Sequence, residues 1–228
     1  MYFQVAIAGA WLMCWNATPQ DPYHHLLLDG VSSDLGSFYQ LDVDGRVLRL
    51  DSFSKVLGGG LRLGWVSGPQ ILVERLRLHQ QSTTMQASTL SMTLAAKLLT
   101  EWGIEGYERH VKKVQAFYRG RRDVTQAAAA KHLTGLASWK PPVAGMFFWF
   151  DLGPSGVVDS RLLITEKCRD KKVLLAPGSA FSVEDGGVSR FARASFSVAE
   201  PEVIEEAFKR LAEVLVEFKA SLAAPCEG

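Results

Sequence analysis

A polar loop between two short apolar runs constrains the fold of this chain more than any other feature of its sequence. The first run, 47–50, leads into the segment 51–55 (DSFSK), and three glycines at 58–60 and then Arg62 follow. The second run, 63–66, has the length and composition of a partner strand. The sequence therefore predicts a pair of strands that presents this loop at one end.

The remaining elements predict an α/β fold up to about residue 104 and an α+β part after it. A hairpin is expected over 41–50, with Asp44-Gly45 as its turn. Three helices are expected next, and they begin at Pro69, at Ser88 (ending at Gly103) and at Glu105. The third helix runs to about Ala130, a length that is typical of a link between two domains.

In the second part, apolar runs and helical periodicity alternate. Strands are expected over 146–150, 173–175 and 191–196, and helices over 160–171 and 200–218. The closing helix is amphipathic. Its buried face is expected to contain Val203, Ala207, Leu211, Val214 and Phe218.

Composition narrows the class of protein and its partners. The 228 residues carry a formal charge of +1 and 47% hydrophobic residues, so no electrostatic footprint for nucleic acid is present. The apolar run 5–15 is too short to span a bilayer and lacks the basic residues of a secretory signal, so no membrane partner is expected. Three scattered cysteines fit neither a metal spacing nor a disulfide framework. We expect a reducing compartment, the cytoplasm, with the mitochondrion as the alternative.

Lys55 is the first candidate for chemistry. A lysine amine can form a Schiff base with an aldehyde cofactor. Ser52 and Ser54 supply hydroxyl donors beside it, and Arg62 supplies a planar fork that suits a phosphate. A ligand with both a phosphate and an amine-reactive carbon matches pyridoxal 5′-phosphate (PLP). The alternative is a polar turn between two strands.

Two further residues are candidates for ligand contacts. Arg193 sits in an otherwise small and apolar strand, where an unpaired guanidinium is costly. It is therefore either a clamp for a substrate carboxylate or one half of a structural ion pair. Tyr23 is either a packing anchor or a phenol that hydrogen-bonds the cofactor. The histidines show no ligand pattern, so no metal is assigned.

Several stretches together resemble class I aminotransferases of fold type I, in the kynurenine/2-aminoadipate and aromatic aminotransferase branch. The Ser52-Phe53-Ser54-Lys55 segment with Arg62 carries the strongest likeness. Further matching stretches are Asp21-Pro22-Tyr23, 41–47, 135–139, 144–147, 177–181 and 193–197. The resemblance extends from about Asp21 to Phe218.

The resemblance implies an α/β fold that is the C-terminal portion of a PLP-dependent transferase. Residues 1–104 would be a partial PLP-binding large domain, and 105–228 the linking helix and the small domain. Lys55 would bind PLP covalently and carry the proton in transamination, and Ser52, Ser54 and Arg62 would hold the phosphate. Tyr23 would hydrogen-bond the pyridoxal oxygen. Arg193 would bind the α-carboxylate of an amino acid or 2-oxo acid, and a homodimer is expected.

Two departures from the family pattern bear on activity. Gln20 stands three residues before Tyr23, where the family has an aspartate that keeps the pyridine nitrogen protonated. Family members also have roughly as much chain again upstream, so we expect a truncated or alternatively started product.

Three functional hypotheses follow from these observations. The first is transamination of an aromatic or 2-aminodicarboxylic amino acid. The second is a catalytically impaired fragment that acts only as a PLP-binding or dimerisation partner. The third, the effector domain of a PLP-dependent transcription regulator, would need an N-terminal helix-turn-helix, and no such pattern is found.

Overall fold

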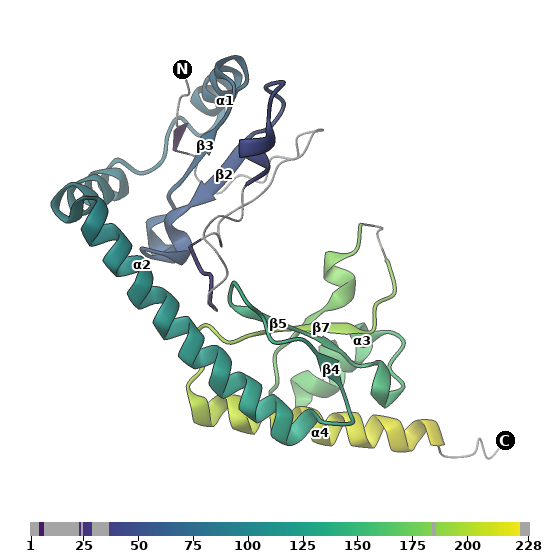
Figure 1. Ribbon diagram of the computed structural model, residues 1–228. Helices are drawn as coiled ribbons and strands as arrows, with labels where there is room; N and C mark the ends of the chain where they lie inside the picture. Colours follow the sequence, from purple (N-terminus) through teal and green to yellow (C-terminus); the bar gives the residue numbers. More distant parts are fainter. Residues whose placement is uncertain (1–4, 7–22, 24, 29–36, 184–185, 224–228) are drawn as a thin grey trace. The chain divides into compact units, whose positions relative to one another are not determined.

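The computed structural model describes residues 5–6, 23, 25–28, 37–183 and 186–223. Contacts along the chain divide it into two compact units, 1–116 and 117–228. Each unit has its own sheet and its own helical cover (Figure 1). The division between the units falls inside the longest helix, α2 (Thr89–Leu133).

The first unit contains a three-stranded antiparallel sheet in the order β1-β3-β2. Its strands are β1 (Val5–Ala6), β2 (Arg49–Ser52) and β3 (Gly64–Ser67). Leu50 pairs with Val66 and Ser52 with Gly64, so the strands on either side of the lysine loop are direct neighbours. The expected pair of strands around this loop is therefore present. The remainder of the apolar run after Ala6 lies outside the described residues.

The expected hairpin over 41–50 is wrong in its first half. Residues Phe38–Leu41 form a 3-10 helix, η1, instead of a strand. The Asp42 carboxylate then accepts hydrogen bonds from the backbone amides of Arg46 (3.0 Å) and Val47 (2.9 Å). Gly45 adopts a φ of 70°, as the expected turn requires. This carboxylate-closed turn satisfies the amides that a strand partner would otherwise have bound.

Helix α1 (Gln70–Thr83) begins directly after Pro69, as expected. Its Val73 packs with Leu48 of the incoming segment and Val66 of β3 in one buried cluster. Helix α2 starts after Ser88, whose hydroxyl accepts from the Ser91 amide at 3.4 Å. Helical geometry is interrupted at Gly103, with φ 59° and ψ −172°, which agrees with the expected stop there.

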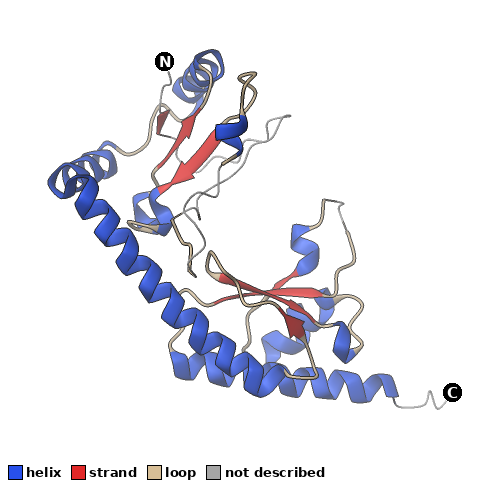
Figure 2. Ribbon diagram, in the orientation of Figure 1, coloured by secondary structure: helices blue, strands red, loops and turns tan. Residues whose placement is uncertain are grey.

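The second unit holds a four-stranded antiparallel sheet in the order β4-β5-β7-β6. Figure 2 draws the strands in red and the helices in blue. Its strands are β4 (Ser138–Trp139), β5 (Phe147–Asp151), β6 (Ala176–Pro177) and β7 (Phe191–Ser195). The expected strands at 146–150 and 191–196 are thus present. The strand expected at 173–175 is found later, as the two-residue β6.

The helices of the second unit cover this sheet. Helix α3 (Ser160–Leu162) continues into a π-helical segment, Leu163–Cys168, and α4 (Pro201–Ala223) closes the chain. Short 3-10 turns lie at Gly153–Ser155 and Gly178–Phe181. Phe150 of β5 meets Phe208 of α4 with ring centroids 5.5 Å apart. Aromatic packing between sheet and helix therefore forms this core.

The buried face of α4 is displaced from the expected one. Ile204, Phe208, Leu211, Val214 and Leu215 are buried, whereas Val203 is exposed. Leu211 and Val214 were expected correctly. A helix with apolar side chains on adjoining positions offers two overlapping stripes, and the aromatic contacts of the sheet select the one that contains Phe208.

Candidate active site

A tight turn at the end of β2 carries Lys55. Residues Phe53–Lys55 form a 3-10 helix, η2, and a second one, η3, spans Gly59–Leu61. The Phe53 carbonyl accepts hydrogen bonds from the amides of Val56 (3.2 Å), Leu57 (2.8 Å) and Gly58 (3.2 Å). The Phe53 amide in turn donates to the Leu63 carbonyl at 3.1 Å. These backbone bonds tie the lysine turn to the start of β3.

The two serines of the turn differ in what their hydroxyls do. The Ser52 Oγ accepts from the Ser54 amide at 3.1 Å and donates to the Leu63 carbonyl at 3.4 Å, so it caps the turn. The Ser54 Oγ has no hydrogen-bond partner among the described residues. Its donor and acceptor capacity is therefore open to a ligand.

Lys55 and Tyr23 lie together in the first unit. The Lys55 Nζ is 5.6 Å from the centroid of the Tyr23 ring. Within the described part of the chain, no carboxylate pairs with the Lys55 amine. The Tyr23 carbonyl accepts from the Leu26 amide at 2.8 Å, which closes a turn at this tyrosine. An amine without a counter-ion is thus held beside a phenol ring.

Arg62 and the glycines form the far side of the loop. Arg62 has a left-handed φ of 52°, its side chain is exposed, and its Nη1 donates to the Gly59 carbonyl at 3.3 Å. A side chain built at Gly58 or Gly60 would meet nothing within 4 Å. At Gly64 a Cβ would lie 2.7 Å from the Asp51 carbonyl oxygen. The packing of the strands thus requires glycine at 64, whereas the loop glycines leave open space.

A partly buried ion pair supports the turn from β2. Arg49 binds both oxygens of Asp51, at 2.8 and 3.0 Å, and the Asp51 side chain is only 7% exposed. Burial, and secondarily the negative charge of Asp51, raise the pKa of Tyr107 on α2. The Tyr107 ring meets His25 edge-on, with centroids 5.7 Å apart. The sequence did not predict these contacts, because the alternation of residues in a strand does not show which charged side chains will pair.

Arg193 lies in the second unit, at the centre of β7. It pairs across the sheet with Trp149 of β5 and with Ala176 of β6. Its guanidinium carbon is 4.1 Å from the Phe147 ring centroid and 4.4 Å from that of Phe181. No carboxylate of the described residues pairs with it. The described residues thus supply no partner for the structural ion pair that was the alternative role of Arg193. The edge of the guanidinium remains available to an anion.

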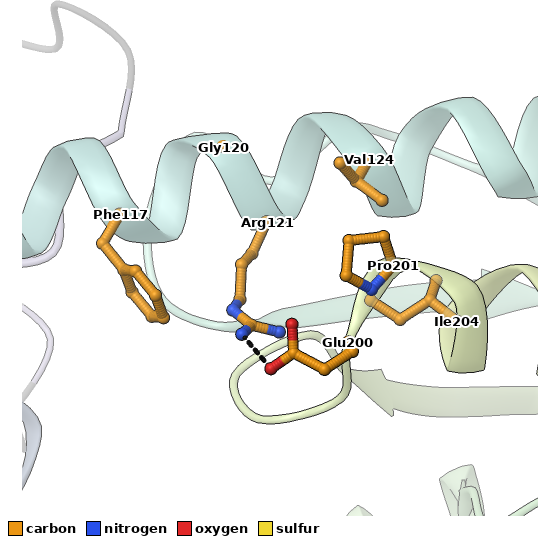
Figure 3. Close-up of a pocket in the computed structure, with 7 residues that line it drawn as sticks. All are labelled: Phe117, Gly120, Arg121, Val124, Glu200, Pro201 and Ile204. Atoms are coloured by element: carbon orange, nitrogen blue, oxygen red, sulfur yellow. Dashed lines mark hydrogen bonds and ion pairs between the residues drawn. The ribbon is translucent and has the colours of Figure 1, made fainter.

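The second unit also contains a hollow of about 300 Å³ (Figure 3). Apolar side chains of α2 and α4, including Phe117, Val124 and Ile204, line it. The one cation that lines it, Arg121, donates to Glu200 at 2.9 Å and to the carbonyls of Val198 and Ala199. Because these contacts engage its guanidinium in joining α2 to the start of α4, the hollow offers no free polar group to a ligand.

The described residues contain no group of His, Cys, Asp and Glu side chains arranged to hold a metal ion. None of the helices they form is long and apolar enough to cross a membrane. Gln20 lies outside the described residues.

Comparison with known proteins identifies the family. The sequence matches the family of class I and II aminotransferases over residues 24–211. The chain belongs to this aminotransferase family. This family depends on PLP and has fold type I, and the relatives with high identity to this chain include mammalian kynurenine/alpha-aminoadipate aminotransferases. The matched range includes the lysine turn of the first unit and strand β7 of the second.

Individual aminotransferases match most of this chain, but this chain spans only about half of their length. The mitochondrial kynurenine/alpha-aminoadipate aminotransferase of Bos taurus is 45% identical over 197 residues, which is 86% of this chain and 45% of the relative. The kynurenine aminotransferase structure from Pyrococcus horikoshii aligns with a TM-score of 0.76 at 31% identity, covering 86% of this chain and 46% of that one. The aromatic aminotransferase Aro9 of Candida albicans gives 0.81 at 27%, covering 90% and 50%. The mixed α/β fold thus corresponds to about half of a fold type I aminotransferase.

Proposed function

We propose that this chain binds PLP covalently at Lys55. We also propose that it takes part in transamination between an aromatic or 2-aminodicarboxylic amino acid and a 2-oxo acid. The observation that carries the proposal is the pair of free groups in one turn. The Lys55 amine has no counter-ion and the Ser54 hydroxyl no partner among the described residues. A family member with these groups free at this position has the contacts that a phosphorylated aldehyde needs.

The residues present fit the cofactor. Ser54 and Arg62 would hold the phosphate, with Ser52 shaping the turn beneath it, and Gly58 and Gly60 leave room for it. Tyr23, beside Lys55, would hydrogen-bond the pyridoxal oxygen. When bound, PLP supplies an electron sink for the bond to be broken. Lys55 Nζ would move the proton.

Arg193 would bind the α-carboxylate of the substrate. Its guanidinium carbon lies over the rings of Phe147 and Phe181, and its N–H groups, which suit a carboxylate in a bidentate manner, pair with no carboxylate of the described residues. The rings also reduce the conformational freedom of the side chain before the substrate arrives. A preoriented guanidinium is what a carboxylate clamp requires.

In this proposal, residues 1–104 form part of a PLP-binding domain and 105–228 the linking helix and small domain. The expected assembly is a homodimer. The expected compartment is the cytoplasm, or the mitochondrion as the name of the bovine relative states for that protein.

The cofactor assignment is tested by trapping. The chain is incubated with PLP and reduced with borohydride, and the labelled peptide is mapped by mass spectrometry. We expect the label on Lys55, with Lys55→Ala unlabelled and Lys140→Ala, at an exposed position outside the turn, labelled as wild type. A wild-type chain without label at Lys55 would refute the proposal.

The second candidate is a PLP-binding or dimerisation partner without turnover of its own. Ile71 on α1 and Leu90, Leu94 and Ile104 on α2 are more than half exposed, and apolar surface of this kind is typical of a surface that binds another protein. Mixing an amino acid with the PLP-loaded chain separates the two candidates. Conversion of the cofactor in one half-reaction supports the enzyme, and labelling of Lys55 without conversion supports the partner.

A further inference from the structure

His110 on α2 contacts the lysine turn across 54 positions of sequence. Its Nε2 lies 2.8 Å from the carbonyl oxygen of Val56, the residue that follows Lys55 and caps η2. A carbonyl oxygen only accepts hydrogen bonds, so Nε2 must carry the proton and donate. The histidine that showed no partner pattern in the sequence is therefore bonded to the exit of the turn.

This bond complements those inside the turn. The amides of Val56, Leu57 and Gly58 all point to the Phe53 carbonyl. The Leu57 amide and the Val56 carbonyl belong to one peptide unit, so Phe53 holds this unit at its N–H and leaves its carbonyl to another partner. His110 supplies that second contact from a different element. The orientation of the peptide that follows Val56 thus depends on α2 as well as on Phe53.

His110 is itself held in place by packing. Its ring lies against Trp102, with centroids 4.8 Å apart and an interplanar angle of 35°. A Cβ at Gly106 would be 2.8 Å from the Trp102 Cβ, so glycine there allows the indole to lie along the helix. Trp102, His110 and Arg109 line a hollow of about 330 Å³ on this side of the first unit. The imidazole is therefore braced on one ring face and accessible at the hollow.

We propose that His110 is a positioning residue for Lys55. Through the Val56 carbonyl it holds the lysine turn in the shape that places the amine for covalent bonding to PLP. This inference rests on the proposed function of Lys55. The role is indirect, since no contact joins His110 to the lysine side chain among the described residues.

Three variants separate positioning from bulk stability. His110→Phe keeps a ring against Trp102 and removes the donor, and His110→Gln restores a donor near the position of Nε2. Arg109→Gln alters the same hollow without touching Val56. The measurements are hydrogen exchange of the amides at 56–58 in the cofactor-free chain and the PLP concentration that half-saturates labelling of Lys55.

We expect His110→Phe to accelerate exchange at 56–58 by about three- to tenfold, the effect of one lost hydrogen bond, and to raise the half-saturating PLP concentration by a similar factor. His110→Gln should recover much of both, and Arg109→Gln should match wild type. Exchange in α1, which packs on the sheet of the same unit, should be the same in all chains, which shows that the first unit of each variant folds.

Unchanged exchange at 56–58 in His110→Phe would overturn the proposal, as would acceleration spread evenly over the first unit. Failure of His110→Gln to recover protection would also overturn it, because the donor is the feature that the proposal requires. A wild-type chain that is not labelled at Lys55 would refute the proposed function instead. The exchange data would then still decide whether His110 holds the turn.

Discussion

Ser52 and Ser54 are two residues apart, and yet alanine at each position should affect a different property. The Ser52 hydroxyl makes two hydrogen bonds inside the chain, at 3.1 and 3.4 Å. The Ser54 hydroxyl makes none with the described residues. Ser52→Ala should therefore reduce the free energy of unfolding, and Ser54→Ala should reduce the affinity for PLP.

The magnitudes follow from these contacts. The Ser52 bond to the Ser54 amide is equivalent to a helix cap, and the longer bond to Leu63 adds little, so Ser52→Ala should cost about 1 kcal/mol. Ser54→Ala should leave the free energy of unfolding within about 0.5 kcal/mol. Losing its bond to a charged phosphate should cost about 1.5–3 kcal/mol of binding, roughly 10- to 150-fold in Kd.

Urea unfolding of the cofactor-free chains and PLP titration of the same preparations measure the two effects separately. Part of any affinity loss in Ser52→Ala would come through the loosened turn, so the stability data are needed to interpret it. Equal destabilisation by both alanines would show that Ser54 is structural. Unchanged PLP affinity in Ser54→Ala would remove it from the phosphate site.

Three further predictions concern other parts of the chain. Gly64→Ala should destabilise by about 1–3 kcal/mol because its Cβ would collide with the Asp51 carbonyl, whereas Gly60→Ala, in open space, should be near neutral in urea unfolding. Gln20→Asp should speed the half-reaction of the PLP-loaded chain by restoring a charge for the pyridine nitrogen, and no gain would refute that account. Because the pKa of Tyr107 is raised, the folded state binds the phenolic proton more tightly than the unfolded state does. The contribution of this proton to stability is therefore complete below about pH 10. It disappears as the pH rises through the folded pKa. The difference in stability between wild type and Tyr107→Phe should be constant below about pH 10 and shift against wild type above it, and a difference that stays constant there would show that the phenol titrates alike in both states.

The strands around the lysine turn could be predicted because their signal is local. The runs 47–50 and 63–66 are apolar and short, and the polar loop between them fixes where one ends and the next begins. The start of α1 at Pro69 and the interruption of α2 at Gly103 are also local signals. The prediction of a hairpin over 41–50 was wrong in its first half because the side chain of Asp42 binds the backbone amides that a strand partner would have bound.

Burial on the helices was harder to predict, because it depends on what each helix meets. Leu90 and Leu94 follow a helical stripe that suggests a core, but both are more than half exposed, while Ala95 on the adjoining face is buried. On α4 the same ambiguity led to an expected face that contains Ala207, whereas the buried face contains Phe208. Periodicity identifies a helix, whereas the choice among its apolar stripes is made by distant residues.

Within the candidate site, the residues found from the sequence are those that a motif brings close together. Ser52, Ser54, Lys55 and Arg62 share one loop. The contact of Tyr23 with Lys55, and that of His110 with Val56, join residues far apart in the chain. The spacing of residues in the sequence did not indicate a role for His110, and His110 is not among the residues that carry the resemblance to the family. Only the folded chain brings α2 to the turn.

The distribution of unsatisfied groups separates the residues that shape the lysine turn from the groups that each unit leaves open to a ligand. Asp51 is neutralised by Arg49, and the Ser52 hydroxyl and the His110 imidazole each bond to backbone, so substitutions there should act through the shape of the turn. The Lys55 amine, the Ser54 hydroxyl and the edge of Arg193 have no such partner among the described residues. Because charged and hydroxyl groups in partly buried positions are costly to leave unpaired, the open state of these three groups supports the ligand contacts that we propose for them. Changes in the first group should therefore lower stability and affinity together, and changes in the second should lower affinity alone.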